Sequence, residues 1–99
     1  MPRGKTISFT VSAVKDLEAI HTWYVDQQVP AVSEKLLREL ISQVERLADF
    51  PENGRVVPEL GLVNLREVIY SPFRIVYRVD ANRVRIVRVW RSERLLKMP

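Results

Sequence analysis

The chain has 99 residues, of which 46% are hydrophobic and 28% charged, and its formal net charge is +4. A chain of this length buries one modest core, so we expect residues 1–99 to form a single domain. There is no cysteine and only one histidine, which excludes disulfides and the usual zinc sites, so we expect neither a metal nor a cofactor. No apolar run approaches the roughly 20 residues of a membrane helix, and no signal peptide is visible. We therefore expect a cytoplasmic protein without membrane contact.

The chain begins with a predicted strand and a predicted helix. Residues 6–11 alternate between polar and apolar side chains, which is typical of a half-buried strand. Ser12 is a typical N-cap residue, and it is followed by apolar side chains at helical spacing. These apolar side chains are Ala13, Leu17, Ile20 and Tyr24. The pattern predicts an amphipathic helix from about Ser12 to Gln28.

A second helix is predicted to begin at Pro30, because proline suits the first helical turn. A wide apolar stripe runs from Leu36 to Ala48, and the helix should end before Pro51, which cannot continue it. The link between the two helices is short, so they should form an antiparallel hairpin.

The last third of the chain predicts a three-stranded antiparallel meander. Turn residues at Ser71-Pro72 and at 80–82 separate segments rich in β-branched and aromatic side chains. On the middle strand, alternation places one set of side chains on one face, namely Phe73, Ile75, Tyr77 and Val79. The opposite face receives Arg74, Val76 and Arg78.

Together these elements predict an α+β fold in which the helical hairpin packs on one face of the sheet. The face with the arginines should remain open or lie in a groove. The position of the first strand in the sheet, at an edge or in the middle, is left open by the sequence.

Positive charge is concentrated in the predicted meander. Residues 65–99 contain nine Lys and Arg against three acidic residues, whereas residues 1–64 contain seven against nine. Such asymmetry favours an acidic partner, either nucleic acid or an acidic protein segment, although a solvated strand face produces the same pattern.

Several short motifs occur in an order that resembles the RelE/ParE toxin superfamily, and most closely its ParE branch. These motifs are Phe50-Pro51, Gly54-Arg55, Pro58-Glu59, Arg66–Ile69, Pro72–Tyr77, Val84–Trp90 and Arg94-Leu95. The resemblance covers nearly the whole chain, because the N-terminal strand and the helical hairpin also match.

The resemblance implies the toxin of a type II toxin–antitoxin system. ParE toxins act on DNA gyrase, stabilise its cleaved-DNA intermediate and block replication, and a ParD-type antitoxin silences them in a hetero-oligomeric complex. RelE toxins instead cleave mRNA on the ribosome. One fold therefore hosts two functions, and the fold alone does not choose between them.

The residues favour gyrase inhibition over RNA cleavage. The nuclease branch is marked by lysines on the strand that matches 65–70, an arginine at the position of Arg74, and an arginine with a tyrosine or histidine near the C-terminus. Here only Arg74 is clearly retained, and no Tyr or His follows Trp90, whose indole has no acid–base capacity. The alternative function is a ribosome-dependent mRNA endoribonuclease.

We therefore assign no catalytic residue and expect a surface that binds the target or the antitoxin. Its candidate residues are Arg66, Arg74, Arg78, Trp90, Arg91 and Arg94. Arg74 is expected to be exposed and dispensable for folding. Direct contact with nucleic acid is left open, His21 is given no role, and Trp23 is a possible anchor for a partner if it faces outward.

Overall fold

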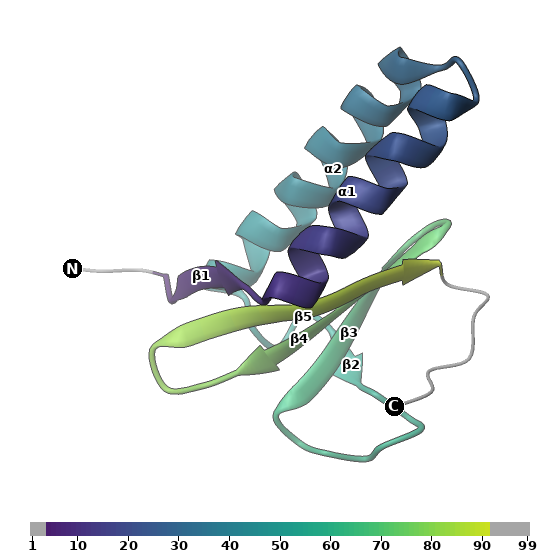
Figure 1. The fold of residues 1–99 in the computed structure, drawn as a ribbon. Coiled ribbons are helices and arrows are strands. Elements are labelled where there is room, and N and C mark those ends of the chain that lie inside the picture. Colours follow the sequence, from purple (N-terminus) through teal and green to yellow (C-terminus); the bar gives the residue numbers. More distant parts are fainter. Residues whose placement is uncertain (1–3, 92–99) are drawn as a thin grey trace.

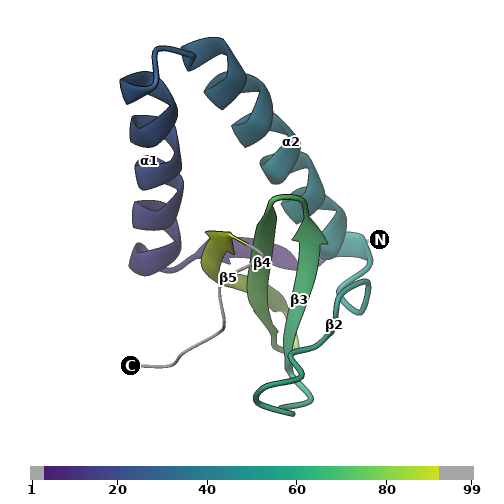
Figure 2. The same cartoon turned by 90° about the vertical axis from the view of Figure 1, so that its right-hand side faces the viewer.

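In the computed structural model, which describes residues 4–91, two helices lie against one face of a five-stranded sheet (Figure 1). In chain order the elements are β1 Thr6–Phe9, α1 Val11–Asp26, α2 Pro30–Asp49, β2 Arg55–Val56, β3 Leu65–Tyr70, β4 Phe73–Val79 and β5 Arg83–Arg91. Figure 2 shows the helical hairpin standing above the sheet, with its connecting turn far from the strands. The predicted α+β class, helical hairpin and three-stranded meander are confirmed.

The sheet order is β1-β5-β4-β3-β2. The first strand lies at an edge and pairs with β5 in parallel, a placement that the sequence left open. At the other edge, β2 pairs with β3 in antiparallel fashion. This strand was not predicted, because two residues are too few to show a strand period.

The first helix begins one residue earlier than predicted, and Ser12 is not its N-cap. Thr10 takes that place, since its Oγ1 accepts a hydrogen bond from the amide of Ala13 at 3.0 Å. The same hydroxyl donates to the carbonyl of Val87 in β5 at 2.8 Å, which fixes the start of α1 on the sheet. The helix ends at Asp26, and Gln28 lies beyond it with a positive φ of 64°.

The second helix has the predicted bounds. Pro30 is in its first turn, and the helix ends at Asp49, before Pro51. Its buried residues include Leu40, Val44 and Leu47. These lie in the half of the helix near the sheet.

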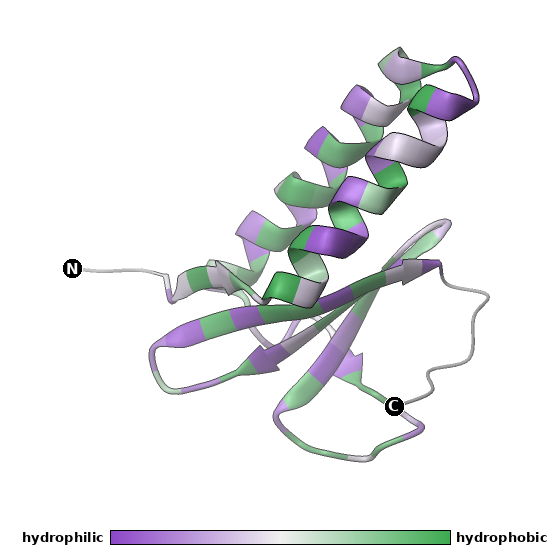
Figure 3. Ribbon diagram, in the orientation of Figure 1, coloured by the Kyte–Doolittle hydropathy of each residue, from purple (hydrophilic) through white to green (hydrophobic). Residues whose placement is uncertain are grey.

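The main core lies between the helical hairpin and the sheet. Its buried members are Ala13, Leu40, Val44, Leu47, Phe73, Ile75, Tyr77, Val84, Ile86 and Val89. Hydrophobic and hydrophilic residues alternate along β5 (Figure 3), as expected for a strand with one buried face. The predicted inward set of β4 is confirmed, with Val79 only partly buried at the end of the strand.

The opposite face of the sheet is only partly open: Arg78, Arg83 and Arg85 on it are exposed, whereas Arg74 and Glu67 are buried. The segment 57–64, between β2 and β3, lies over part of it and encloses a second apolar cluster of Val57, Leu65 and Val76. Leu60, Val87 and Trp90 pack around this cluster.

Within residues 4–91, no helix has the length and apolar character of a membrane span.

Candidate interaction site

Arg74 sits at the centre of a chain of alternating charges on the helix-free face. Its Nε lies 3.1 Å from Oε1 of Glu67, an ion pair without hydrogen-bond alignment, and its Nη1 lies 3.3 Å from Oε2 of Glu59. The other oxygen of Glu67 accepts from Nε of Arg55 at 2.7 Å. Two guanidinium groups and two carboxylates thus neutralise one another.

The prediction that Arg74 is exposed is wrong. The residue is 7% exposed and Glu67 only 1%, because segment 57–64 and the apolar cluster cover this part of the sheet. Alternation correctly placed Arg74 away from the helices, but it carries no information about what covers that second face. Arg74 is therefore a buried, paired side chain.

Arg66 and Arg74 lie on opposite faces of the sheet. Arg66 pairs with Tyr77 in the register of β3 and β4, and its Nη1 donates to the carbonyl of Gly54 at 2.9 Å. The hydroxyl of Tyr77 accepts from the amide of Gly54 and donates to the carbonyl of Pro51, at 2.8 and 2.7 Å. A Cβ on Gly54 would lie 2.6 Å from that hydroxyl, so this close approach requires glycine. Arg66 thus supports the loop that precedes β2.

Trp90 belongs to a separate arrangement that joins β5 to α1. The guanidinium of Arg88 stacks over the Trp90 ring at 4.5 Å from its centroid. It also forms a bidentate ion pair with Asp16, in which Nε donates to Oδ2 at 2.8 Å and Nη2 donates to Oδ1 at 2.9 Å. Asp16 also accepts from the amide of Val89 at 2.9 Å. This hydrogen bonding raises the pKa of Arg88 further above its usual value. This pair was not predicted from the sequence, because its partners are 72 residues apart.

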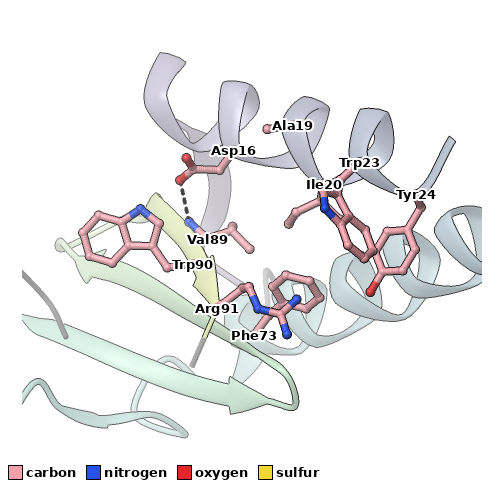
Figure 4. A pocket seen from close by; sticks show the side chains of 9 residues that line it. All are labelled: Asp16, Ala19, Ile20, Trp23, Tyr24, Phe73, Val89, Trp90 and Arg91. Atoms are coloured by element: carbon pink, nitrogen blue, oxygen red, sulfur yellow. Dashed lines mark hydrogen bonds between the residues drawn. The ribbon is translucent and has the colours of Figure 1, made fainter. Parts of the chain in front are cut away.

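A groove of about 480 Å³ opens between α1 and the ends of β4 and β5 (Figure 4). Its wall is mainly apolar and aromatic, and it is lined by Asp16, Ala19, Ile20, Trp23, Tyr24, Phe73, Val89, Trp90 and Arg91. Trp23 is 53% exposed and packs edge-to-face against Tyr24 with ring centroids 4.9 Å apart. The condition attached to Trp23 as an anchor, that it face outward, is met.

The remaining predicted site residues are dispersed. Arg91 lies at the groove, with its guanidinium 5.9 Å from the centroid of the Phe73 ring. Arg78 is exposed near the other end of β4, opposite Arg85. Arg94 lies outside the described residues. The structure therefore does not gather the six candidates into one site, and only Trp90 and Arg91 line the same groove.

The described tyrosines of the sheet are placed as structural groups. Tyr77 is fully buried, and this burial raises the pKa of its hydroxyl. Tyr70 donates to Oε1 of Glu39 on α2 at 2.5 Å, and this hydrogen bond raises the pKa of Tyr70. A raised pKa makes a phenol a poorer proton donor near neutral pH. Among residues 4–91, no group of His, Asp and Glu is arranged to hold a metal ion.

Comparison with known proteins identifies the family. A model described as the ParE toxin of the type II toxin–antitoxin system parDE matches residues 7–96. The chain belongs to the ParE toxin family. It is thus a toxin of the ParE/RelE superfamily and part of a type II toxin–antitoxin system.

Relatives of this ParE-family toxin span both branches of the superfamily by name. It is 34% identical over 90 residues to Toxin RelE2 of Caulobacter vibrioides, which covers 90% of this chain and 97% of the relative. A structure of the chromosomal ParDE system from P. aeruginosa superposes with a TM-score of 0.76 and 26% identity, over 90% of this chain and 97% of that one. The RelBE2 toxin–antitoxin complex of Mycobacterium tuberculosis shares the fold, with a TM-score of 0.64 and 22% identity over 89% and 98% of the two chains.

Proposed function

We propose that this toxin inhibits DNA gyrase and so blocks replication in the cytoplasm. The observation that carries the proposal is the neutralisation of Arg74 by Glu67 and Glu59. RNA cleavage requires a cation that stabilises the extra negative charge on phosphate in the transition state. Arg74 is the one clearly retained position of the nuclease pattern, and here it is 7% exposed and its charge is opposed by a fully buried carboxylate.

The lysines and the C-terminal tyrosine or histidine of the nuclease pattern are also missing at the matching positions of this sequence. Glu67 occupies the strand on which the nuclease branch carries lysines, and there it is committed to two arginines. Tyr70 is engaged by Glu39, and the sequence beyond Trp90 has no Tyr or His. Gyrase inhibition requires protein contact and no proton transfer by the toxin, which agrees with these features.

We further propose that a ParD-like antitoxin silences the toxin by covering the groove between α1 and the sheet. Exposed Trp23 and half-buried Trp90 offer the aromatic anchors that are typical of protein interfaces. Arg91 supplies positive charge at the same groove. An acidic, amphipathic antitoxin segment would match this combination and would become ordered as it binds.

One pair of assays tests the target. Purified toxin is added to gyrase with relaxed plasmid and, separately, to ribosomes that translate a defined mRNA. We expect loss of supercoiling or accumulation of cleaved plasmid, and intact mRNA. Cleavage of mRNA with unimpaired supercoiling would instead support the second candidate function, a RelE-type nuclease. The similarity to Toxin RelE2 of Caulobacter vibrioides is the reason for testing it.

The antitoxin site is tested with Trp23→Ala. Because Trp23 is half exposed, its truncation should leave the melting temperature nearly unchanged while weakening the complex with the co-expressed antitoxin at least 10-fold. The matched control is Phe50→Ala, which removes another exposed aromatic side chain far from the groove. Equal affinity of both variants and the wild-type toxin would contradict this placement.

A further inference from the structure

A cluster of positive charge lies at the β4–β5 hairpin, at the other end of β4 from Arg74. It consists of Arg78, Arg83 and Arg85, which we call the hairpin arginines. All three are exposed, and within residues 4–91 none of them forms an ion pair or a side-chain hydrogen bond. They contrast with Arg74 and Arg88, which are both neutralised by carboxylates.

The strand register places the hairpin arginines on one face. Their alternating neighbours Tyr77, Val84 and Ile86 are buried in the main core. The arginines therefore point to the helix-free side of the sheet. Arg78 lies directly opposite Arg85 in the antiparallel pairing of β4 and β5. Arg83 precedes Arg85 by two residues and therefore lies on the same face.

This arrangement is unfavourable for folding alone. Like charges directly opposite one another in a sheet are destabilising. Lys5 adds a fourth positive charge beside the hairpin, since its Nζ donates to the carbonyls of Asp80 and Ala81 at 3.0 and 2.6 Å. An anionic partner would relieve the repulsion, and guanidinium groups are well suited to phosphate.

The surroundings favour a nucleic acid backbone over an acidic peptide. Protein interfaces are usually centred on apolar or aromatic side chains, and β1, β4 and β5 contribute no exposed large hydrophobic residue among residues 4–91. The exposed apolar residues Leu62 and Val63 belong to the loop beside β4, not to these strands. A phosphate backbone, in contrast, is bound chiefly through positive charge.

We propose that the hairpin arginines bind the phosphate backbone of duplex DNA, and that they engage the DNA held by gyrase. The second part rests on the proposed gyrase target, whereas the first does not. The surface would hold DNA through charge, without reading its sequence.

The test uses fluorescence anisotropy with a labelled duplex of mixed sequence, from 50 to 200 mM salt. Three phosphate contacts should give a slope of log K against log salt of about −3, since each contributes about 0.9. The variant Arg78→Gln/Arg83→Gln/Arg85→Gln should bind at least 10-fold more weakly and lose most of this slope. The matched control Lys15→Gln/Lys35→Gln/Arg38→Gln removes three exposed charges from the helices and should bind like wild type.

Three results would overturn the DNA surface. They are absence of binding by the wild-type toxin, equal losses in the two triple variants, and tighter binding to a polyglutamate peptide than to DNA, which would indicate an acidic protein partner. Gyrase assays on the same proteins separate the two proposals. If the wild type binds DNA through the hairpin arginines but leaves supercoiling intact, the surface stands and the gyrase target fails. If the hairpin variant loses DNA binding yet inhibits gyrase fully, the role of the surface in gyrase inhibition is refuted.

Discussion

Replacing Glu67 by methionine should destabilise the protein by about 3 kcal/mol. Breaking a buried ion pair from one side typically costs about 3–5 kcal/mol, because the partner charge is left buried. Glu59 remains near Arg74 and is 31% exposed, so the lower end of that range applies. The contact with Arg55 adds little, since that side chain is 63% exposed and water can solvate it.

The loss is measured by urea and thermal unfolding. A change of 1 kcal/mol shifts the melting temperature of a domain of this size by roughly 4–8 °C, so Glu67→Met should melt about 12–24 °C below wild type. Arg55→Met is the control on the exposed side of the same carboxylate. It should cost no more than about 1 kcal/mol.

A double-mutant cycle shows whether the cost comes from the pair. Arg74→Met should also be strongly destabilising, but Glu67→Met/Arg74→Met should recover most of the loss, because two apolar side chains of similar volume replace a buried pair with little penalty. If the free energy of unfolding of each single variant lies within about 0.5 kcal/mol of wild type, or if the two losses simply add in the double variant, Glu67 and Arg74 are not a coupled buried ion pair. The double variant also tests function, since it removes the charge of Arg74 from a folded toxin. The proposed function expects it to remain toxic.

Three further outcomes follow from the core and from the groups with shifted pKa values or paired charges. Leu40→Ala should cost about 2–5 kcal/mol in urea unfolding, because Leu40 is 1% exposed, and a cost below 1 kcal/mol would contradict its place in the core. Burial raises the pKa of Tyr77, so the free energy of unfolding should be at its full value below about pH 10, the unfolded pKa, and should fall as the pH rises through the folded pKa. Urea unfolding measured from pH 8 to 11 should show this fall, and Tyr77→Phe should reduce its slope against pH. Asp16→Asn should cost about 1–3 kcal/mol by weakening the contact with Arg88, whereas the exposed Glu18→Gln should stay within about 0.5 kcal/mol of wild type.

The elements that could be predicted are those whose signal is local. The start of α2 at Pro30 and its end before Pro51 are written in neighbouring residues, as is the inward face of β4. The predicted start of α1 was wrong because Thr10 and Ser12 are both suitable N-cap residues, and the hydrogen bond from Thr10 to the carbonyl of Val87 favours Thr10. That contact joins residues 77 positions apart, which no local pattern reports.

The candidate site depended on long-range pairing and was predicted less well. The alternation of β4 correctly puts Arg74 and Arg78 on one face, yet the first is buried and the second exposed. Their difference arises from the neighbouring strands, since β3 brings Glu67 to Arg74 whereas β5 brings Arg85 to Arg78. Knowing this requires the register and the course of segment 57–64. The sequence contained one hint of the ion pair, namely an acidic residue, Glu67, on the predicted strand next to that of Arg74.

The pairing of Arg74 and Arg88 also changes where the positive potential of the C-terminal half lies. The net charge of that half comes from all its arginines, but a carboxylate cancels the field of the guanidinium it contacts, and here Asp16, Glu59 and Glu67 act on Arg74 and Arg88. The uncancelled charge is therefore displaced toward the β4–β5 hairpin and away from Arg74. A phosphate drawn to this sheet would meet the exposed guanidinium groups of Arg78, Arg83 and Arg85, whereas Arg74 and Arg88 are already paired with carboxylates. The charge distribution thus agrees with a toxin that holds DNA and leaves cutting to its target enzyme.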